Sequence, residues 1–174
     1  MEKYVGVKFK TRMEKGRIGN VSEFLKIDRM LARYINPKEN EGNMSMRIRD
    51  GFLIKRSGAR MTSLKKSDVV LVRRIKGNVV YSVGGIPSSE SLMHYKIYKK
   101  REDANLILHF HEDLLLEKLD WPAVDPLPYG SKELANAVAK LSVKSNKIKI
   151  KGHGFVIIAR SKEELIKILE EALN

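Results

Sequence analysis

Three of the four histidines in this chain stand where their side chains can bind a metal ion. His109 and His111 are two residues apart at the end of an apolar run that is typical of a buried strand. Because alternate strand residues share a face, both imidazoles should project the same way. His153 follows a second strand-like run and has glycine on either side. Three neutral imidazoles with one open position form a common catalytic zinc site. The alternative is that these are ordinary strand-end histidines with hydrogen-bonded rings.

The composition limits both the chemistry and the setting. A chain of 174 residues suits a single domain with one core. It has no cysteine, so a transition metal must be bound by His, Asp or Glu. The first residues lack the apolar core of a signal peptide, and no apolar run approaches the length that spans a membrane. We therefore expect a cytoplasmic protein with no membrane partner.

The net charge of +13 raises the question of nucleic acid binding. The basic residues are dispersed, however, and form neither an arginine-rich arm nor a recognised nucleic-acid motif. A solvated basic face is the default interpretation, attraction of phosphorylated small molecules is the second, and nucleic acid is the third. We expect no specific nucleic-acid partner.

The spacing of apolar residues predicts an α/β fold with a mostly antiparallel central sheet flanked by helices, a three-layer sandwich. The predicted helices span residues 23–34, 90–100, 131–141 and 161–173, with Ser22, Ser131 and Ser161 as expected N-caps. The predicted strands span residues 44–48, 52–54, 69–72, 79–83, 106–111 and 148–158, the last running through His153. We divide the chain into an N-terminal extension of uncertain structure, residues 1–21, and a domain, residues 22–174.

Three segments carry the donors that an anion needs. Glu41-Gly42-Asn43 enters the first predicted hairpin, and Arg56-Ser57-Gly58 leaves it. Glycine lets backbone N–H groups approach a ligand closely, and Asn and Ser add further donors. The third segment is the helix start at Ser88-Ser89-Glu90, where the helix dipole favours a phosphate. Each segment alone is also an ordinary turn or cap, but the combination indicates a phosphate site.

The order and spacing of these motifs resemble the class II aldolase/adducin superfamily, above all its fuculose-phosphate aldolases. The resemblance runs from about residue 22 to the C-terminus. It rests on Gly42-Asn43-Met44-Ser45-Met46-Arg47, Gly51-Phe52-Leu53-Ile54, Ser57-Gly58, Leu64, Asp68-Val69-Val70, Pro87-Ser88-Ser89-Glu90, His94, residues 101–105, His109-Phe110-His111, residues 129–135 and Gly152-His153-Gly154.

The resemblance implies a role for each matching residue. A metal, usually Zn²⁺ although another divalent ion is possible, is held by His109, His111 and His153. Glu90 matches the acidic residue that borders the metal and serves as the acid/base, and His94 matches a position behind it. The residues that match the phosphate-binding positions are Asn43, Ser57, Gly58, Ser88 and Ser89. The family commonly forms homotetramers with active sites at subunit interfaces.

The implied activity is that of a zinc-dependent sugar-phosphate aldolase, which cleaves a small phosphorylated ketose through a metal-stabilised enediolate. A sugar-phosphate dehydratase or epimerase on the same site is the second hypothesis, because the same intermediate serves those reactions. A non-enzymatic, adducin-like binding protein is the third, and the complete ligand set argues against it. The aldolases also use a tyrosine from a longer segment after the second histidine. Here only a short loop separates His111 from Tyr129, and that tyrosine has no counterpart.

Overall fold

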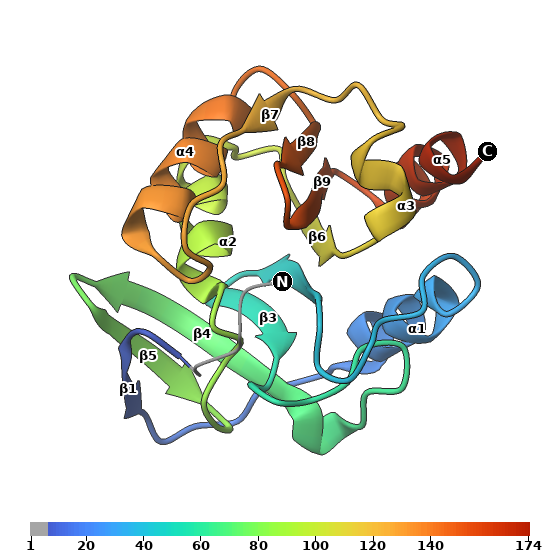
Figure 1. Cartoon of the computed structure of the whole chain (residues 1–174). Helices are drawn as coiled ribbons and strands as arrows, with labels where there is room; N and C mark the ends of the chain where they lie inside the picture. The colour runs from blue at the N-terminus through green and yellow to red at the C-terminus, as the bar shows by residue number, and fades with distance from the viewer. Residues whose placement is uncertain (1–6) are drawn as a thin grey trace.

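The structure, a computed structural model, describes residues 7–174. These residues form one nine-stranded sheet in the order β1-β5-β4-β3-β2-β6-β9-β8-β7, with helices on both faces (Figure 1). Neighbouring strands are antiparallel except for the two edge pairs, β1–β5 and β7–β8, which are parallel. The predicted three-layer α/β sandwich with a mostly antiparallel sheet is therefore confirmed.

The elements follow one another as strands and helices of ordinary length. The strands are β1 (Lys10–Met13), β2 (Asn43–Ile48), β3 (Gly51–Lys55), β4 (Val69–Lys76), β5 (Val79–Val83), β6 (Leu106–Phe110), β7 (Ala123–Val124), β8 (Lys147–Ile150) and β9 (Gly154–Ala159). The helices are α1 (Ser22–Leu31), α2 (Ser91–Lys100), α3 (Asp113–Leu116), α4 (Lys132–Ser142) and α5 (Lys162–Leu173), with a short 3₁₀ turn at Lys66–Asp68. No helix in this part of the chain is long and apolar enough to cross a membrane.

Alternation along the strands builds two cores, one on each face of the sheet. In β3, Leu53 packs toward α1 and α5, whereas Phe52 and Ile54 pack toward α2 and α4. Both faces are covered in this way, so β3 and β6 are almost wholly apolar. Burying a polar side chain in such a strand costs free energy unless the side chain has a partner. The polar residues in these strands therefore indicate where a site could lie.

The strand order places β6 between β2 and β9. Asn43, the first residue of β2, is opposite His109 of β6, and His109 is opposite Val156 of β9. One level of the sheet thus holds Asn43 and His109 side by side. The candidate functional site lies at this level, near the end of β6.

The predicted continuous strand through His153 is wrong. β8 and β9 are the two arms of an antiparallel hairpin, with Ile150 opposite Gly154 and His153 in the turn between them. Gly152 has a φ of +67°, a conformation that L side chains rarely adopt. A side chain at Gly154 would lie 2.5 Å from the Phe110 carbonyl oxygen. The two glycines therefore permit the reversal that brings His153 back over β6.

The helix starts match the predictions in part. Ser131 and Ser161 are N-caps, accepting hydrogen bonds from the N–H groups of Leu134 (3.1 Å) and Glu164 (3.2 Å). Ser22 is not a cap, because it is already helical and its own N–H donates to Asn20 Oδ1 at 2.9 Å. The short elements α3 and β7 were not predicted, since neither is long enough to show a period.

Part of the N-terminal extension joins the sheet. β1 pairs in parallel with β5 and forms one edge of the sheet. Lys8, just before β1, reaches across to the loop before α4, where its Nζ donates to the Tyr129 carbonyl oxygen at 2.7 Å. Residues 1–6 of the extension lie outside the described residues.

A buried polar cluster joins α2 to the sheet behind the site. Ser45 Oγ lies 2.6 Å from His94 Nδ1 and 2.9 Å from the Tyr98 hydroxyl. Burial lowers the pKa of His94 to about 3, although the charge on Glu90 acts in the opposite direction. His94 is therefore a neutral structural group at pH 7.

This buried histidine predicts that the metal-free protein loses stability in mild acid. Its pKa is about 3 when folded and about 6.5 when unfolded, so the unfolded chain binds more protons between these values. The unfolding free energy should fall as pH drops below about 6.5, with His94 contributing up to about 1.4 kcal/mol per pH unit. Urea titrations of wild-type and His94→Gln proteins from pH 8 to pH 4 measure the difference. Identical slopes in the two proteins would contradict the prediction.

Candidate metal and anion site

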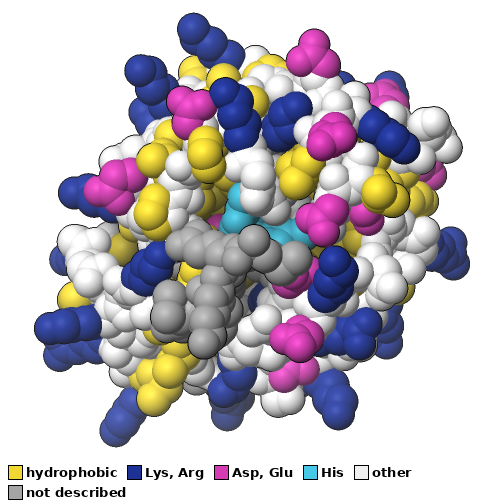
Figure 2. Space-filling view, in the orientation of Figure 1, with side chains coloured by type: hydrophobic (Ala, Val, Ile, Leu, Met, Phe, Trp, Pro, Cys, Tyr) yellow, Lys and Arg dark blue, Asp and Glu magenta, His cyan; other side chains and the backbone are white. Residues whose placement is uncertain are grey.

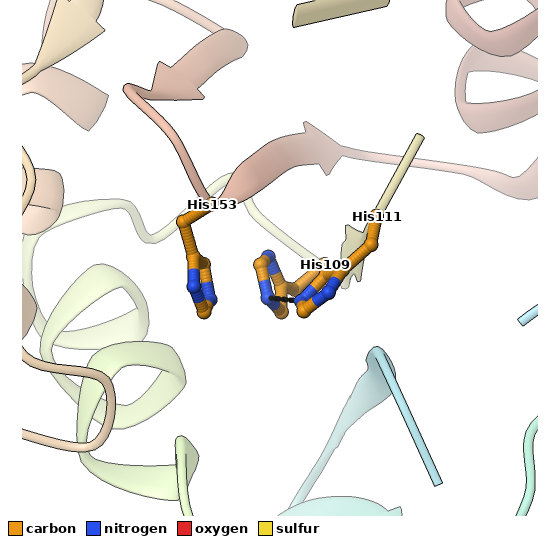
Figure 3. A group of neighbouring side chains, drawn as sticks. All are labelled: His109, His111 and His153. Atoms are coloured by element: carbon orange, nitrogen blue, oxygen red, sulfur yellow. Dashed lines mark hydrogen bonds between the residues drawn. The ribbon is translucent and has the colours of Figure 1, made fainter. Parts of the chain in front are cut away.

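Three imidazoles converge at one end of the β6–β9 pair. His109 belongs to β6, His111 follows its last residue, and His153 comes from the β8–β9 turn (Figure 3). The ring centroids are 4.6 to 5.0 Å apart, and the His109 and His153 rings stack at an interplanar angle of 6°. One nitrogen of each ring lies within 4.8 Å of the others, close enough for all three to bind one ion. The convergence predicted from the strand period is thus found, with His153 supplied by a turn.

The hydrogen bonding of His109 decides which nitrogen faces the centre. Its Nδ1 lies 2.9 Å from the Phe155 carbonyl oxygen, which can only accept, so Nδ1 carries the proton. Nε2 therefore presents a lone pair, and it lies 3.1 Å from Glu90 Oε2, another acceptor. Two acceptors at this distance repel each other unless a cation lies beside them. Three imidazoles and a carboxylate, with no thiolate, are a donor set that fits a divalent metal.

Glu90 is buried beside these imidazoles as the N-cap residue of α2. Asn43 Nδ2 donates to its Oε2 at 3.0 Å, and His153 Nε2 lies 3.6 Å from its Oε1. Burial alone would raise the pKa of Glu90, but His109, His153 and Asn43 outweigh burial and hold it well below its usual range. The side chain is therefore an ionised carboxylate at neutral pH.

Two of the histidines, His109 and His111, are in the protonation state that a metal requires. Burial lowers the pKa of His109, and burial together with the neighbouring imidazoles lowers the pKa of His111 to about 3. Neutral imidazoles bind metals, whereas imidazolium ions do not. Protons should therefore compete for these ligands only well below pH 6.5.

The anion segments open into the same cavity, which has a volume of about 1030 Å³. The predicted residues that line it are Asn43, Ser57, Gly58, Ser88, Ser89, Glu90, His111 and His153. His109 lies beneath, with 1% of its side chain exposed. The space-filling view shows the histidines at the centre of this face, with basic side chains spread around its edge (Figure 2). The structure thus brings all the predicted site residues together, and their individual roles stay predictions.

Two backbone N–H groups of the segments predicted to bind an anion are already hydrogen-bonded within the fold. The Ser57 N–H donates to the Ile86 carbonyl oxygen at 2.9 Å, and the Ser88 N–H donates to the Lys55 carbonyl oxygen at 3.0 Å. These two bonds join the loop after β3 to the loop before α2. An anion in the cavity would therefore meet serine hydroxyl groups there, and not these two N–H groups.

Residues 22–116 match the model of the Class II Aldolase and Adducin N-terminal domain. This chain belongs to the class II aldolase/adducin family. The match begins where α1 begins and ends with α3, so it includes every predicted site residue except His153.

Individual class II aldolases match over nearly the whole chain. An L-fuculose phosphate aldolase of Methanococcus maripaludis is 31% identical over 173 residues, covering 87% of this chain and 92% of that protein. A solved L-fuculose 1-phosphate aldolase superposes with a TM-score of 0.74 at 27% identity, covering 90% of this chain and 82% of the other. The L-fuculose-1-phosphate aldolase of Thermus thermophilus shares the fold, with a TM-score of 0.69 at 22% identity over 86% and 88% of the two chains. The protein is thus homologous to metal-dependent aldolases.

Sequence reasoning missed Lys55 as a residue of this cavity. Lys55 ends β3 and lines the cavity, yet it is only 2% exposed. Its Nζ donates to the carbonyl oxygens of Asn40 (2.6 Å) and Ala59 (2.5 Å). Burial lowers the pKa of Lys55 to about 8, while the charges on Glu90 and Asp28 raise it, so the amine keeps its proton at pH 7. The signal was available, because alternation places Lys55 on the same covered face as Leu53.

The three-histidine centre predicts about one Zn²⁺ per chain. His111→Ala should lose the ion and keep the fold, because His111 lies beyond the end of β6 and outside both cores. Elemental analysis after reloading with Zn²⁺ measures the stoichiometry, and circular dichroism measures the fold. Glu112→Ala, a change at the next residue, is the control and should keep its zinc. Wild-type protein without stoichiometric zinc would contradict the prediction.

Proposed function

We propose that this protein is a zinc-dependent sugar-phosphate aldolase that cleaves a small phosphorylated ketose. The observation that carries the proposal is the meeting of three imidazoles and an ionised carboxylate with several serine side chains in one cavity. Homology to metal-dependent aldolases supports the reaction class. The Methanococcus relative's name, an L-fuculose phosphate aldolase, supports a phosphorylated sugar as the substrate class.

The metal would be held by His109, His111 and His153, with Glu90 at its border. Zinc suits three imidazoles, and another divalent ion is compatible with the same donors. When bound, such an ion supplies Lewis-acid polarisation of a substrate oxygen and stabilises the negative charge that develops as the carbon–carbon bond breaks.

Glu90 is placed to move the proton. Asn43 Nδ2 donates to its Oε2 at 3.0 Å, and its Oε1 lies 3.6 Å from His153 Nε2, on the side of the imidazoles. As a carboxylate, Glu90 can remove a proton from the reacting carbon in the direction of synthesis, and the protonated form can return it during cleavage. Its burial keeps water away from this transfer and fixes the oxygen's direction.

The phosphate group would bind beside Asn43, Ser57, Gly58, Ser88 and Ser89, all of which line the cavity. The buried ammonium group of Lys55, which also lines the cavity, adds a positive charge there. Binding the phosphate there fixes the substrate's register relative to Glu90 and the histidines. Orienting the substrate in this way lowers the activation barrier of the reaction, and no further catalytic group is needed for this effect.

Dehydration or epimerisation of a sugar phosphate on the same site is the second candidate. It is favoured by one observation, the lack of a counterpart in this sequence for the aldolases' tyrosine after the second histidine. A screen of phosphorylated ketoses, and of dihydroxyacetone phosphate with aldehydes, separates the reactions by their products. We further propose that the protein is a cytoplasmic homotetramer. Light scattering of the purified protein can test the tetramer.

Replacing the proposed acid/base should stop turnover without removing the metal. Glu90→Gln keeps the side chain's volume but cannot exchange the proton, so turnover should fall by about two to four orders of magnitude. Zinc content, measured in parallel, should stay at the wild-type level. Glu112→Gln, which changes another carboxylate lining the cavity, should keep most of its activity. Wild-type turnover in Glu90→Gln would assign the proton transfer to another residue.

Removing one hydroxyl of the proposed phosphate wall should weaken phosphorylated ligands selectively. Ser89→Ala deletes a donor to a charged group, so affinity for inorganic phosphate and for sugar phosphates should fall about tenfold or more. Zinc binding should be unchanged. Ser63→Ala, at an exposed serine outside the cavity lining, is the matched control. Equal affinity of the wild-type protein for phosphorylated and unphosphorylated sugars would rule out the phosphate wall.

A further inference from the structure

The two histidines at the end of β6 are held in different ways. The His109 ring is fixed within the sheet, since its Nδ1 donates to the Phe155 carbonyl oxygen at 2.9 Å. His111 lies past the end of the strand, and 23% of its side chain is exposed. Its Nε2 faces His109 Nε2 at 2.9 Å, so its Nδ1 points away from the centre.

The group that faces Nδ1 of His111 is a carboxylate from another loop. Glu41 Oε1 lies 3.9 Å from it, and Glu41 lines the same cavity. A neutral imidazole carries one proton, so if Nε2 is to bind a metal, the proton must be on Nδ1. That N–H then points at Glu41.

The backbone holds Glu41 at this place. Its N–H donates to the Lys38 carbonyl oxygen at 3.0 Å. The next residue, Gly42, has a φ of +68°, and a side chain there would lie 2.8 Å from the His109 carbonyl oxygen. The loop therefore passes directly against β6, at a level that only glycine allows. The Glu41 side chain is 23% exposed, so it has room to move toward His111.

We propose that Glu41 is a positioning residue for the metal centre: its carboxylate accepts the Nδ1–H of His111 and so turns the ring's Nε2 toward the metal. The contact must shorten from 3.9 Å to about 2.8 Å, the usual length of a charge-assisted hydrogen bond. Carboxylate partners of this kind fix the tautomer and direction of ligating imidazoles and raise their basicity. The inference rests on the metal site of the proposed function.

Zinc affinity tests this role without any need for a substrate. Metal-free wild-type, Glu41→Ala and Glu41→Gln proteins are titrated with Zn²⁺ in competition with a chromophoric chelator. Glu41→Ala should raise the zinc dissociation constant by about 10- to 100-fold. Glu41→Gln keeps an acceptor oxygen and should lose less. Unchanged affinity in a folded Glu41→Ala protein would overturn the proposal.

A matched control separates positioning from simple charge attraction. Glu112→Ala also removes one negative charge from the cavity wall, next to His111 in the chain. Its zinc affinity should change by less than about threefold, as for a solvent-screened charge. An equal loss in Glu112→Ala and Glu41→Ala would mean that only net charge matters, and would also overturn the proposal.

Nitrogen-15 NMR of the histidine rings detects the hydrogen bond between His111 Nδ1–H and Glu41 directly. In the zinc-loaded wild-type protein, His111 should show a protonated Nδ1 whose exchange with water is slowed. Glu41→Ala should speed that exchange and leave the Nδ1–H of His109 unchanged. A fast-exchanging Nδ1–H on His111 in the wild-type protein would overturn the proposal, even if the variant does not fold. Failure of the wild-type protein to bind zinc would instead reject the proposed metal-dependent function itself.

Discussion

The antiparallel pairing of β6 with β9 is the constraint on which the site depends. It places His109 opposite Val156 and gives its Nδ1 the Phe155 carbonyl oxygen, so the ring's lone pair faces the centre. A slip of one residue would turn His109 to the other face of the sheet. The same strand pairs with β2, which sets Asn43 at the level of His109 and within reach of Glu90. The register of the backbone pairing thus decides which side chains meet at the site.

Burial sets the charge of the centre as well as its shape. Removal from water lowers the pKa of His109 and His111, so the imidazoles are neutral. Glu90 is also buried, but its neighbours hold it ionised. A cluster of neutral nitrogen lone pairs around one carboxylate attracts a cation. This local charge pattern is compatible with a bound cation even though the chain as a whole carries a net charge of +13.

The two halves of the cavity are built from different kinds of element. The histidine side comes from the end of β6 and the tight β8–β9 turn, and the His109 ring is fixed within the sheet. The serine side comes from the loop after β3 and the segment before α2, which two backbone hydrogen bonds join. Rigid strands suit ligands that must converge on one ion, whereas loops at strand ends can be varied to fit different substrates.

Local patterns in the sequence were enough for the fold class, the family and the shared face of His109 and His111. These features depend on the period of a strand or on short motifs, which are properties of neighbouring residues. Tertiary structure alone decided that His153 stands in a turn, that Asn43 donates to Glu90, and that Glu41 faces His111. Each of these contacts joins residues from different elements. These arrangements follow from the strand register and from glycines whose backbone packs closely against the carbonyl oxygens of β6. The local spacing of apolar residues encodes neither feature.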